Sequence, residues 1–225
     1  MTDFSDFLEA LEEDAFEEKP VDIEEFVTSN DYLALPPLSD YQYQMIKAST
    51  QIYKHETLVK LYGEEEGEKR WKQTCNEVIF QLGKGSGKDY TSTIACAYIV
   101  YLLLCLKDPA RYYGKPPGDA IDIINVAVNA VQAQQVFFKG FKNRITRCPW
   151  FIGKYNEKVG SIEFIKSITV HSGHSQRESW EGYNLLFAVL DEISGFDLES
   201  TSGNEQAKTA SAIDRKSTRL NSSHT

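Results

Sequence analysis

Apolar residues along the middle of the chain form short runs of strand length that alternate with longer runs at helical spacing. The short runs are bounded by glycine or polar residues and predict strands at 77–82, 121–128 and 185–190. The longer runs, 90–107 and 130–145, predict helices. The middle of the chain therefore has the order strand, helix, strand, helix, with a last strand near the C-terminus.

Two further elements are predicted beside this alternation. A helix begins at Ser39 or Asp40 after a double proline, and residues 161–165 with 168–171 predict a hairpin. Repeated strand–helix–strand order with apolar strands predicts an α/β fold, with a mainly parallel sheet covered by helices on both faces. Right-handed crossovers would then place the carboxyl ends of the parallel strands on one edge of the sheet.

Charge and composition divide the chain into an acidic start and a nearly neutral remainder. The 225 residues are 41% hydrophobic, which is enough for one core and excludes disorder throughout. Residues 1–30 hold 11 acids and one lysine, a charge of −10, so the other 195 residues sum to +1 within the net charge of −9. We expect 1–30 to be an acidic, flexible leader, and the neutral remainder neither favours nor excludes a DNA partner.

The sequence does not favour membrane insertion, secretion or a metal site built from cysteine or histidine. The apolar run that contains Tyr98–Leu106 begins at Ile94 and has 13 residues, which is shorter than the roughly 20 residues that cross a bilayer. The N-terminus lacks the basic start and apolar run of a secretory signal, which predicts an intracellular protein. His171 and His174 lie three residues apart in strand and loop sequence without a third ligand. The single cysteines are expected to be buried thiols: Cys75, Cys96, Cys105 and Cys148.

A glycine-rich segment, Gly83-Lys84-Gly85-Ser86-Gly87-Lys88, joins the predicted strand 77–82 to the predicted helix 90–107. Backbone N–H groups can curl round a triphosphate only where glycines allow unusual dihedral angles and close approach. The helix N-terminus adds donors and a positive dipole end, and Lys88 is placed to reach the outer phosphates. This order predicts a phosphate-binding loop; the alternative is a plain strand-to-helix turn with solvated lysines.

The loop departs from the pattern Gly-x-x-x-x-Gly-Lys-Ser/Thr at two positions. Leu82 stands where the first glycine is usual, and Asp89 stands where a hydroxyl normally meets magnesium. A carboxylate is a suitable hard-oxygen ligand for that ion, although it adds negative charge beside the phosphates. Asp89 is therefore a candidate magnesium ligand.

Two acids follow the last predicted strand. Asp191 and Glu192 leave the carboxyl end of 185–190, where a nucleotide engine needs one acid to orient the metal's water shell and a second to polarise the attacking water. Asp191 is the candidate metal residue and Glu192 the candidate catalytic residue. The alternative is a strand that simply ends in two exposed acids.

These motifs together resemble the N-terminal packaging ATPase of the large terminase subunit of tailed double-stranded DNA phages, from about Leu33 to Ile213. Gly83–Lys88 is similar to the terminase loop variant that lacks the first glycine. Leu38-Ser39-Asp40-Tyr41-Gln42 is similar to the upstream motif whose glutamine lies on the adenine side, with Gln44 as the alternative. The segments 127–133 and 182–184 also resemble the terminase sequences after the second strand and before the acidic pair.

The resemblance implies a P-loop NTPase of the additional-strand, catalytic-glutamate type that hydrolyses ATP with Mg²⁺ to move viral double-stranded DNA into procapsids. It implies a homo-oligomeric ring in the host cytoplasm, with the portal protein and the small terminase subunit as partners and no membrane. Lys84 stands where many members carry a charge-stabilising arginine, and Arg177 is the other basic candidate. The nucleotide-binding residues implied are Gln42, Gly83, Lys84, Gly85, Ser86, Gly87, Lys88 and Asp89.

The resemblance also sets the expected limits of the domain. Residues 31–213 form an ATPase that is incomplete at its C-terminal end and lacks the family's nuclease, while 214–225 resemble a translated sequencing adapter and are expected to be a non-native tail. Two other functional classes stay open. A helicase-like DNA-dependent ATPase shares the glutamine, the loop and the acids, although Ile193-Ser194 is not its usual continuation; a nucleotide-binding assembly module would bind without turnover.

Overall fold

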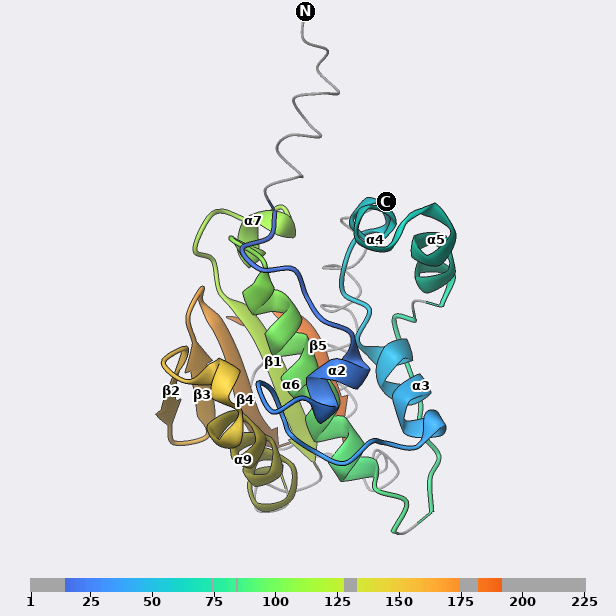
Figure 1. Cartoon of the computed structure of the whole chain (residues 1–225). Coiled ribbons are helices and arrows are strands. Elements are labelled where there is room, and N and C mark those ends of the chain that lie inside the picture. Colours follow the sequence, from blue (N-terminus) through green and yellow to red (C-terminus); the bar gives the residue numbers. More distant parts are fainter. Residues whose placement is uncertain (1–14, 74, 84, 128–132, 175–181, 192–225) are drawn as a thin grey trace, which may run out of the picture.

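The computed structural model describes residues 15–73, 75–83, 85–127, 133–174 and 182–191 (Figure 1). Its helices are α2 (Ile23–Thr28), α3 (Asp40–Ser49), α4 (His55–Tyr62), α5 (Glu64–Lys72), α6 (Lys88–Cys105), α7 (Pro109–Tyr112), the π-helix η1 (Ala133–Phe138), α9 (Lys139–Arg147) and the short 3₁₀ helix η2 (Pro149–Phe151). Its strands are β1 (Ile121–Ala127), β2 (Tyr155–Lys158), β3 (Ser161–Phe164), β4 (Ile168–His174) and β5 (Leu185–Leu190).

The described strands form one mixed sheet in the order β2-β3-β4-β1-β5. β1 pairs in parallel with β4 and β5, whereas β2, β3 and β4 pair antiparallel. The expected mainly parallel sheet is therefore wrong for the β2–β3–β4 half. The predicted hairpin is confirmed as β3–β4, and its turn contains Lys166 and Ser167 at φ 61° and 58°, the left-handed pair that suits the twist of a tight hairpin.

The helix α6 is the centre of the hydrophobic core. It lies across one face of the sheet, with α2 and α3 on its outer side and α9 beside it (Figure 1). All residues from Ile94 to Cys105 are buried, which explains a helix that is apolar on every side. On the other face of the sheet, the described residues form only a small cluster around Ile124, Val126 and Leu185. The prediction of helices on both faces of the sheet is therefore confirmed for one face within the described residues.

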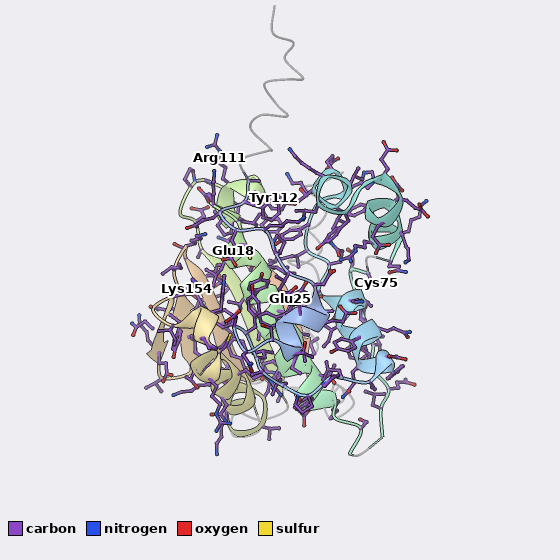
Figure 2. All side chains as sticks on the ribbon, viewed as in Figure 1. Glu18, Glu25, Cys75, Arg111, Tyr112 and Lys154 are labelled. Carbon is purple, nitrogen blue, oxygen red and sulfur yellow. The ribbon has the colours of Figure 1, made fainter. Side chains whose placement is uncertain are left out.

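Residues 15–30 belong to this core. In α2, Ile23, Phe26 and Val27 are buried, and the Phe26 ring packs against Tyr98 and Tyr101 of α6 at centroid distances of 5.2 and 4.8 Å. Figure 2 shows Glu18 of this segment over α6, where its carboxylate accepts a hydrogen bond from Trp150 Nε1 at 3.0 Å. A flexible leader over 1–30 is therefore wrong for 15–30, because its few apolar residues are spaced to cover α6. Residues 1–14 lie outside the described residues.

Two other predicted elements differ in the structure. The predicted strand 77–82 forms no strand within the described residues, and the Ile79 side chain is 71% exposed. A strand requires a neighbour for its N–H and C=O groups, and the described sheet ends at β5. The predicted helix 130–145 begins as the π-helix η1 and continues as α9 to Arg147, while its first residues lie outside the described part.

A polar cluster connects three strands at the edge of the sheet opposite the carboxyl ends of β1 and β5. Asp122 is 5% exposed; one carboxylate oxygen lies 2.8 Å from His171 Nε2, and the other accepts the Asn184 N–H at 2.8 Å. His171 is thus accounted for by a structural contact between β1 and β4. The residues that the structure describes contain no group of three potential metal ligands, and the side chain of His174 lies outside them.

Three of the four cysteines are buried thiols, as expected. Burial raises the pKa of Cys96 and Cys148 and raises that of Cys105 to about 12, so these thiols stay protonated and inert. Cys75 is exposed at the surface (Figure 2), and the expectation of burial is wrong there. No helix in the described part of the chain is both long and apolar enough to cross a lipid bilayer.

Candidate phosphate-binding site

The glycine-rich loop leads directly into α6, and its backbone takes conformations that favour glycine. Gly85 and Gly87 have φ values of 82° and 79°, and Gly87 is the left-handed residue that precedes α6. A turn closes between the Ser86 N–H and the Gly83 carbonyl at 3.2 Å. Side chains with a Cβ rarely adopt such dihedrals, so the glycines at 85 and 87 are required by the local geometry. Lys84 lies outside the described residues.

The first turn of α6 presents its N-terminus to this loop. The first N–H groups of a helix have no acceptor within the helix, and they carry the positive end of its dipole. The first bond of the helix runs from the Thr91 N–H to the Gly87 carbonyl at 2.9 Å, so the amides of the preceding residues face the loop. Ser86 is exposed, and Lys88 and Asp89 are half-buried in this turn. Backbone N–H groups in this arrangement are able to bind an anion.

Lys88 and Asp191 meet although they are 103 residues apart in sequence. The Lys88 Nζ donates to Asp191 Oδ1 at 3.0 Å, and the Asp191 side chain is only 15% exposed. The Asp191 N–H donates to the Val126 carbonyl at 2.9 Å, which extends the pairing of β5 with β1 by one residue. The sheet therefore carries Asp191 to the first turn of α6. Glu192, the next residue, lies outside the described residues, as does Arg177.

Gln42 connects α3 to the same loop. Its Oε1 accepts from the Ser39 N–H at 3.1 Å and, together with the Ser39 side chain, forms a capping box at the start of α3. Its Nε2 donates to Thr91 Oγ1 at 3.3 Å and lies 3.3 Å from the position that a Cβ on Gly87 would occupy. Gln42 thus borders the loop, whereas Gln44 is exposed.

Thr91 is a member of this site that the sequence did not indicate. It lies four residues after Gly87, so the two positions share one face of α6, and it is 2% exposed. Its role as the partner of Gln42 depends on how α3 packs against α6. That packing is a tertiary contact with no local signal in the chain.

Comparison with known proteins identifies the same kind of domain. A sequence family described as the N-terminal P-loop domain of uncharacterized protein MJ0330 matches residues 2–221. The chain belongs to this P-loop family. Uncharacterized protein MJ0330 of Methanocaldococcus jannaschii is 37% identical over 133 residues, which cover 54% of this chain and 23% of that protein. The chain thus corresponds to about a quarter of that relative's length.

The family assigns a phosphate-loop domain and no particular reaction. No solved structure matches the chain. The names of the matching family and of the archaeal relative do not mention a terminase. The comparisons therefore support a P-loop domain, and the terminase resemblance depends only on the sequence motifs.

Proposed function

We propose that this domain binds ATP together with Mg²⁺ and hydrolyses it. The observation that supports the proposal most directly is the 3.0 Å contact between Lys88, at the start of α6, and Asp191, at the end of β5. One group suits phosphate oxygens and the other suits a hydrated cation, and a metal-bound triphosphate needs both at one place.

The residues of the loop bind and orient the phosphates. The left-handed glycines at 85 and 87 allow backbone N–H groups to approach the phosphates closely, and the N-terminus of α6 adds its dipole. Lys88 neutralises charge on the outer phosphates, which requires its ammonium group to leave Asp191. Without a nucleotide, the Lys88–Asp191 pair keeps both charged groups balanced in a half-buried site.

The carboxylates near the loop fit a magnesium ion. Magnesium is usually held in proteins by one or two carboxylates together with substrate phosphates and waters. Asp191 would hold it at the end of β5, and Asp89 of the first α6 turn is the second candidate. Held there, the ion would supply positive charge that offsets the negative charge of the phosphates.

Glu192 is the proposed residue that polarises the attacking water. Its position directly after Asp191 would bring a second carboxylate to the same edge of the sheet. With Glu192 in this role, the domain would be a P-loop NTPase of the additional-strand, catalytic-glutamate type. Lys84 is proposed as the charge-stabilising residue of the loop, because it stands among the glycines beside the phosphates.

Coupling of hydrolysis to movement of double-stranded DNA is supported by the resemblance to packaging terminases alone. The contact of Gln42 with Thr91 agrees with a glutamine on the nucleotide side of α3. Hydrolysis that double-stranded DNA stimulates would favour a translocating motor, of the packaging or the helicase kind. In the packaging case, the portal protein and small terminase subunit would be its partners. ATP hydrolysis at the same rate with and without double-stranded DNA would indicate an ATPase that does not translocate DNA.

Binding and turnover of ATP by Lys88→Ala and Glu192→Gln test the proposal. We expect Lys88→Ala to lose both, because the variant lacks the ammonium group that would neutralise the outer phosphates at the start of α6. We expect Glu192→Gln to lower turnover by about 10²-fold or more and to leave the ATP dissociation constant within a few-fold, because the acid acts only on water. Calorimetry measures the binding, and phosphate release measures the turnover.

Lys60→Ala, an exposed lysine on α4, is the matched control and should change neither quantity. Wild-type protein that binds ATP without turnover would select the assembly-module alternative. Full ATP binding by Lys88→Ala would remove the phosphate-loop assignment itself.

A further inference from the structure

An exposed aromatic ring stands beside the phosphate loop without an assigned role. Tyr90, two residues after Lys88 on α6, is 37% exposed, although α6 is otherwise largely buried. A tyrosine at the surface of an apolar helix leaves a broad π face in contact with water. Aromatic faces of this kind are the surfaces on which nucleobases stack.

Arg144 of α9 braces this ring from one side. Its guanidinium carbon lies 4.4 Å from the centroid of the Tyr90 ring. Its Nη2 donates to the Tyr90 carbonyl at 3.3 Å, and its Nε donates to Thr93 Oγ1 at 2.7 Å. Burial lowers the pKa of Arg144, and none of the described residues forms a salt bridge with it. The contacts that hold this partly desolvated cation are therefore those to Tyr90 and Thr93.

The packing of α9 against α6 makes the brace rigid. A Cβ added to Gly140 would lie 3.3 Å from Thr93 Cγ2, so the two helices approach closely where Arg144 crosses. A planar guanidinium that stacks on a ring and bonds to the backbone of the same residue fixes the ring orientation. One face of Tyr90 is thus covered by Arg144.

Gln42, from α3, and Tyr90, on the α9 side of α6, both lie near Gly87. Gln42 lies against Gly87 and Thr91. Gly87 and Tyr90 are three residues apart, and residues at this spacing are neighbours on one side of a helix. A nucleotide whose phosphates lie at the N-terminus of α6 would bring its base within reach of the Tyr90 ring.

We propose that Tyr90, braced by Arg144, is the platform on which the base of the bound nucleotide stacks. This inference rests on the proposed function, because it requires the phosphates to be bound by the loop. Stacking tolerates any base, since every base has a π face. The platform therefore adds affinity for nucleoside triphosphates as a class and does not by itself select adenine.

Competition between nucleotides and inorganic tripolyphosphate tests the platform. Tripolyphosphate occupies the loop and has no base. We expect Tyr90→Ala to weaken the binding of ATP and of GTP by about 10-fold or more while tripolyphosphate binds as in the wild type. Tyr90→Phe should keep ATP affinity within about threefold, because the ring is retained. Calorimetric titrations of the full chain with Mg²⁺ measure all three ligands.

Tyr41→Ala is the matched control. Tyr41 is 57% exposed and adjacent to Gln42, but neighbouring residues on a helix do not share a face, so ATP binding should be unchanged. Unchanged ATP affinity in Tyr90→Ala, or an equal loss for ATP and tripolyphosphate, would overturn the platform. A loss of ATP affinity in Tyr41→Ala instead of in Tyr90→Ala would overturn the platform as well. Failure of the wild type to bind tripolyphosphate would contradict the proposed function instead.

Discussion

At the scale of single residues, the phosphate loop depends on backbone geometry more than on side chains. Gly85 and Gly87 adopt left-handed dihedrals that an L-residue enters only at a cost of about 1–2 kcal/mol. Gly87 also lies against Gln42, so a methyl group there would press on the side chain that links α3 to α6. The loop therefore has two independent reasons to keep glycine at 87.

We expect Gly87→Ala to destabilise the protein by about 1 kcal/mol and to weaken ATP binding by about tenfold, because the loop must shift to relieve both strain and contact. Thermal unfolding and ATP titration measure the two effects. Gly153→Ala is a matched control, since Gly153 has φ 78° with nothing near its added Cβ and lies in an exposed turn. That variant should lose similar stability and keep its ATP affinity. Equal ATP affinity in both variants would contradict the account of the loop.

Residue types with one local use were predictable from the sequence, and residues defined by tertiary contacts were not. Glycines that precede a lysine at the start of a helix are typical of a phosphate-binding loop, so this loop and Lys88 could be predicted from the sequence. The sequence predicted Asp191 at the end of the strand 185–190, and the structure brings it 3.0 Å from Lys88, a contact that the sequence did not indicate. Arg144 had no local signal, because its place beside Tyr90 exists only after α9 has packed on α6.

At the scale of secondary-structure elements, α2 shows why composition was a poor guide to the N-terminal boundary. Its surface carries Glu24 and Glu25, which make the segment look like a solvated acidic tail. Its inner side carries Ile23, Phe26 and Val27, which cover Tyr98 and Tyr101 of α6. Six residues are too few for a helical pattern to stand out against acidic neighbours.

We expect Phe26→Ala to lower the free energy of unfolding by about 3–5 kcal/mol, because Phe26 is fully buried among aromatic rings. Chemical denaturation followed by circular dichroism measures the change. Glu25→Gln, at the exposed neighbouring position labelled in Figure 2, should alter stability by less than about 0.5 kcal/mol. A stability loss below about 1 kcal/mol in Phe26→Ala would restore the view that this segment is a mobile leader.

The run 77–82 shows the opposite limit of pattern-based prediction. Val78, Phe80 and Leu82 are half-buried while Glu77, Ile79 and Gln81 are exposed, so the alternation of a strand is present. Alternation describes the side chains of a strand and supplies no partner for its backbone. The predicted hairpin β3–β4 forms because a tight turn brings its two strands within hydrogen-bonding distance. The run 77–82 has no such neighbouring strand within the described sheet.

At the scale of the whole molecule, the mixed sheet positions the site through β1 and β5. Their parallel pairing brings the end of β5 to the loop edge, whereas β2, β3 and β4 extend the sheet on the far side. The α4–α5 hairpin lies away from the sheet and is joined to α7 through Tyr112, whose hydroxyl accepts from the Lys54 N–H at 2.7 Å and bonds to Thr57 (Figures 1 and 2). At the N-terminal end of α6, the phosphate loop leads into the helix, α3 contacts it through Gln42 and Thr91, and α9 contacts it through Arg144 and Thr93.

The structure of the full chain with Mg²⁺ and a non-hydrolysable ATP analogue tests the central claim most directly. The account predicts the triphosphate at the amides of 85–88, Lys88 withdrawn from its 3.0 Å contact with Asp191 and turned to the phosphates, and Asp191 facing the metal. A nucleotide bound elsewhere, or a Lys88–Asp191 pair that stays closed around an empty loop at saturating analogue, would contradict it.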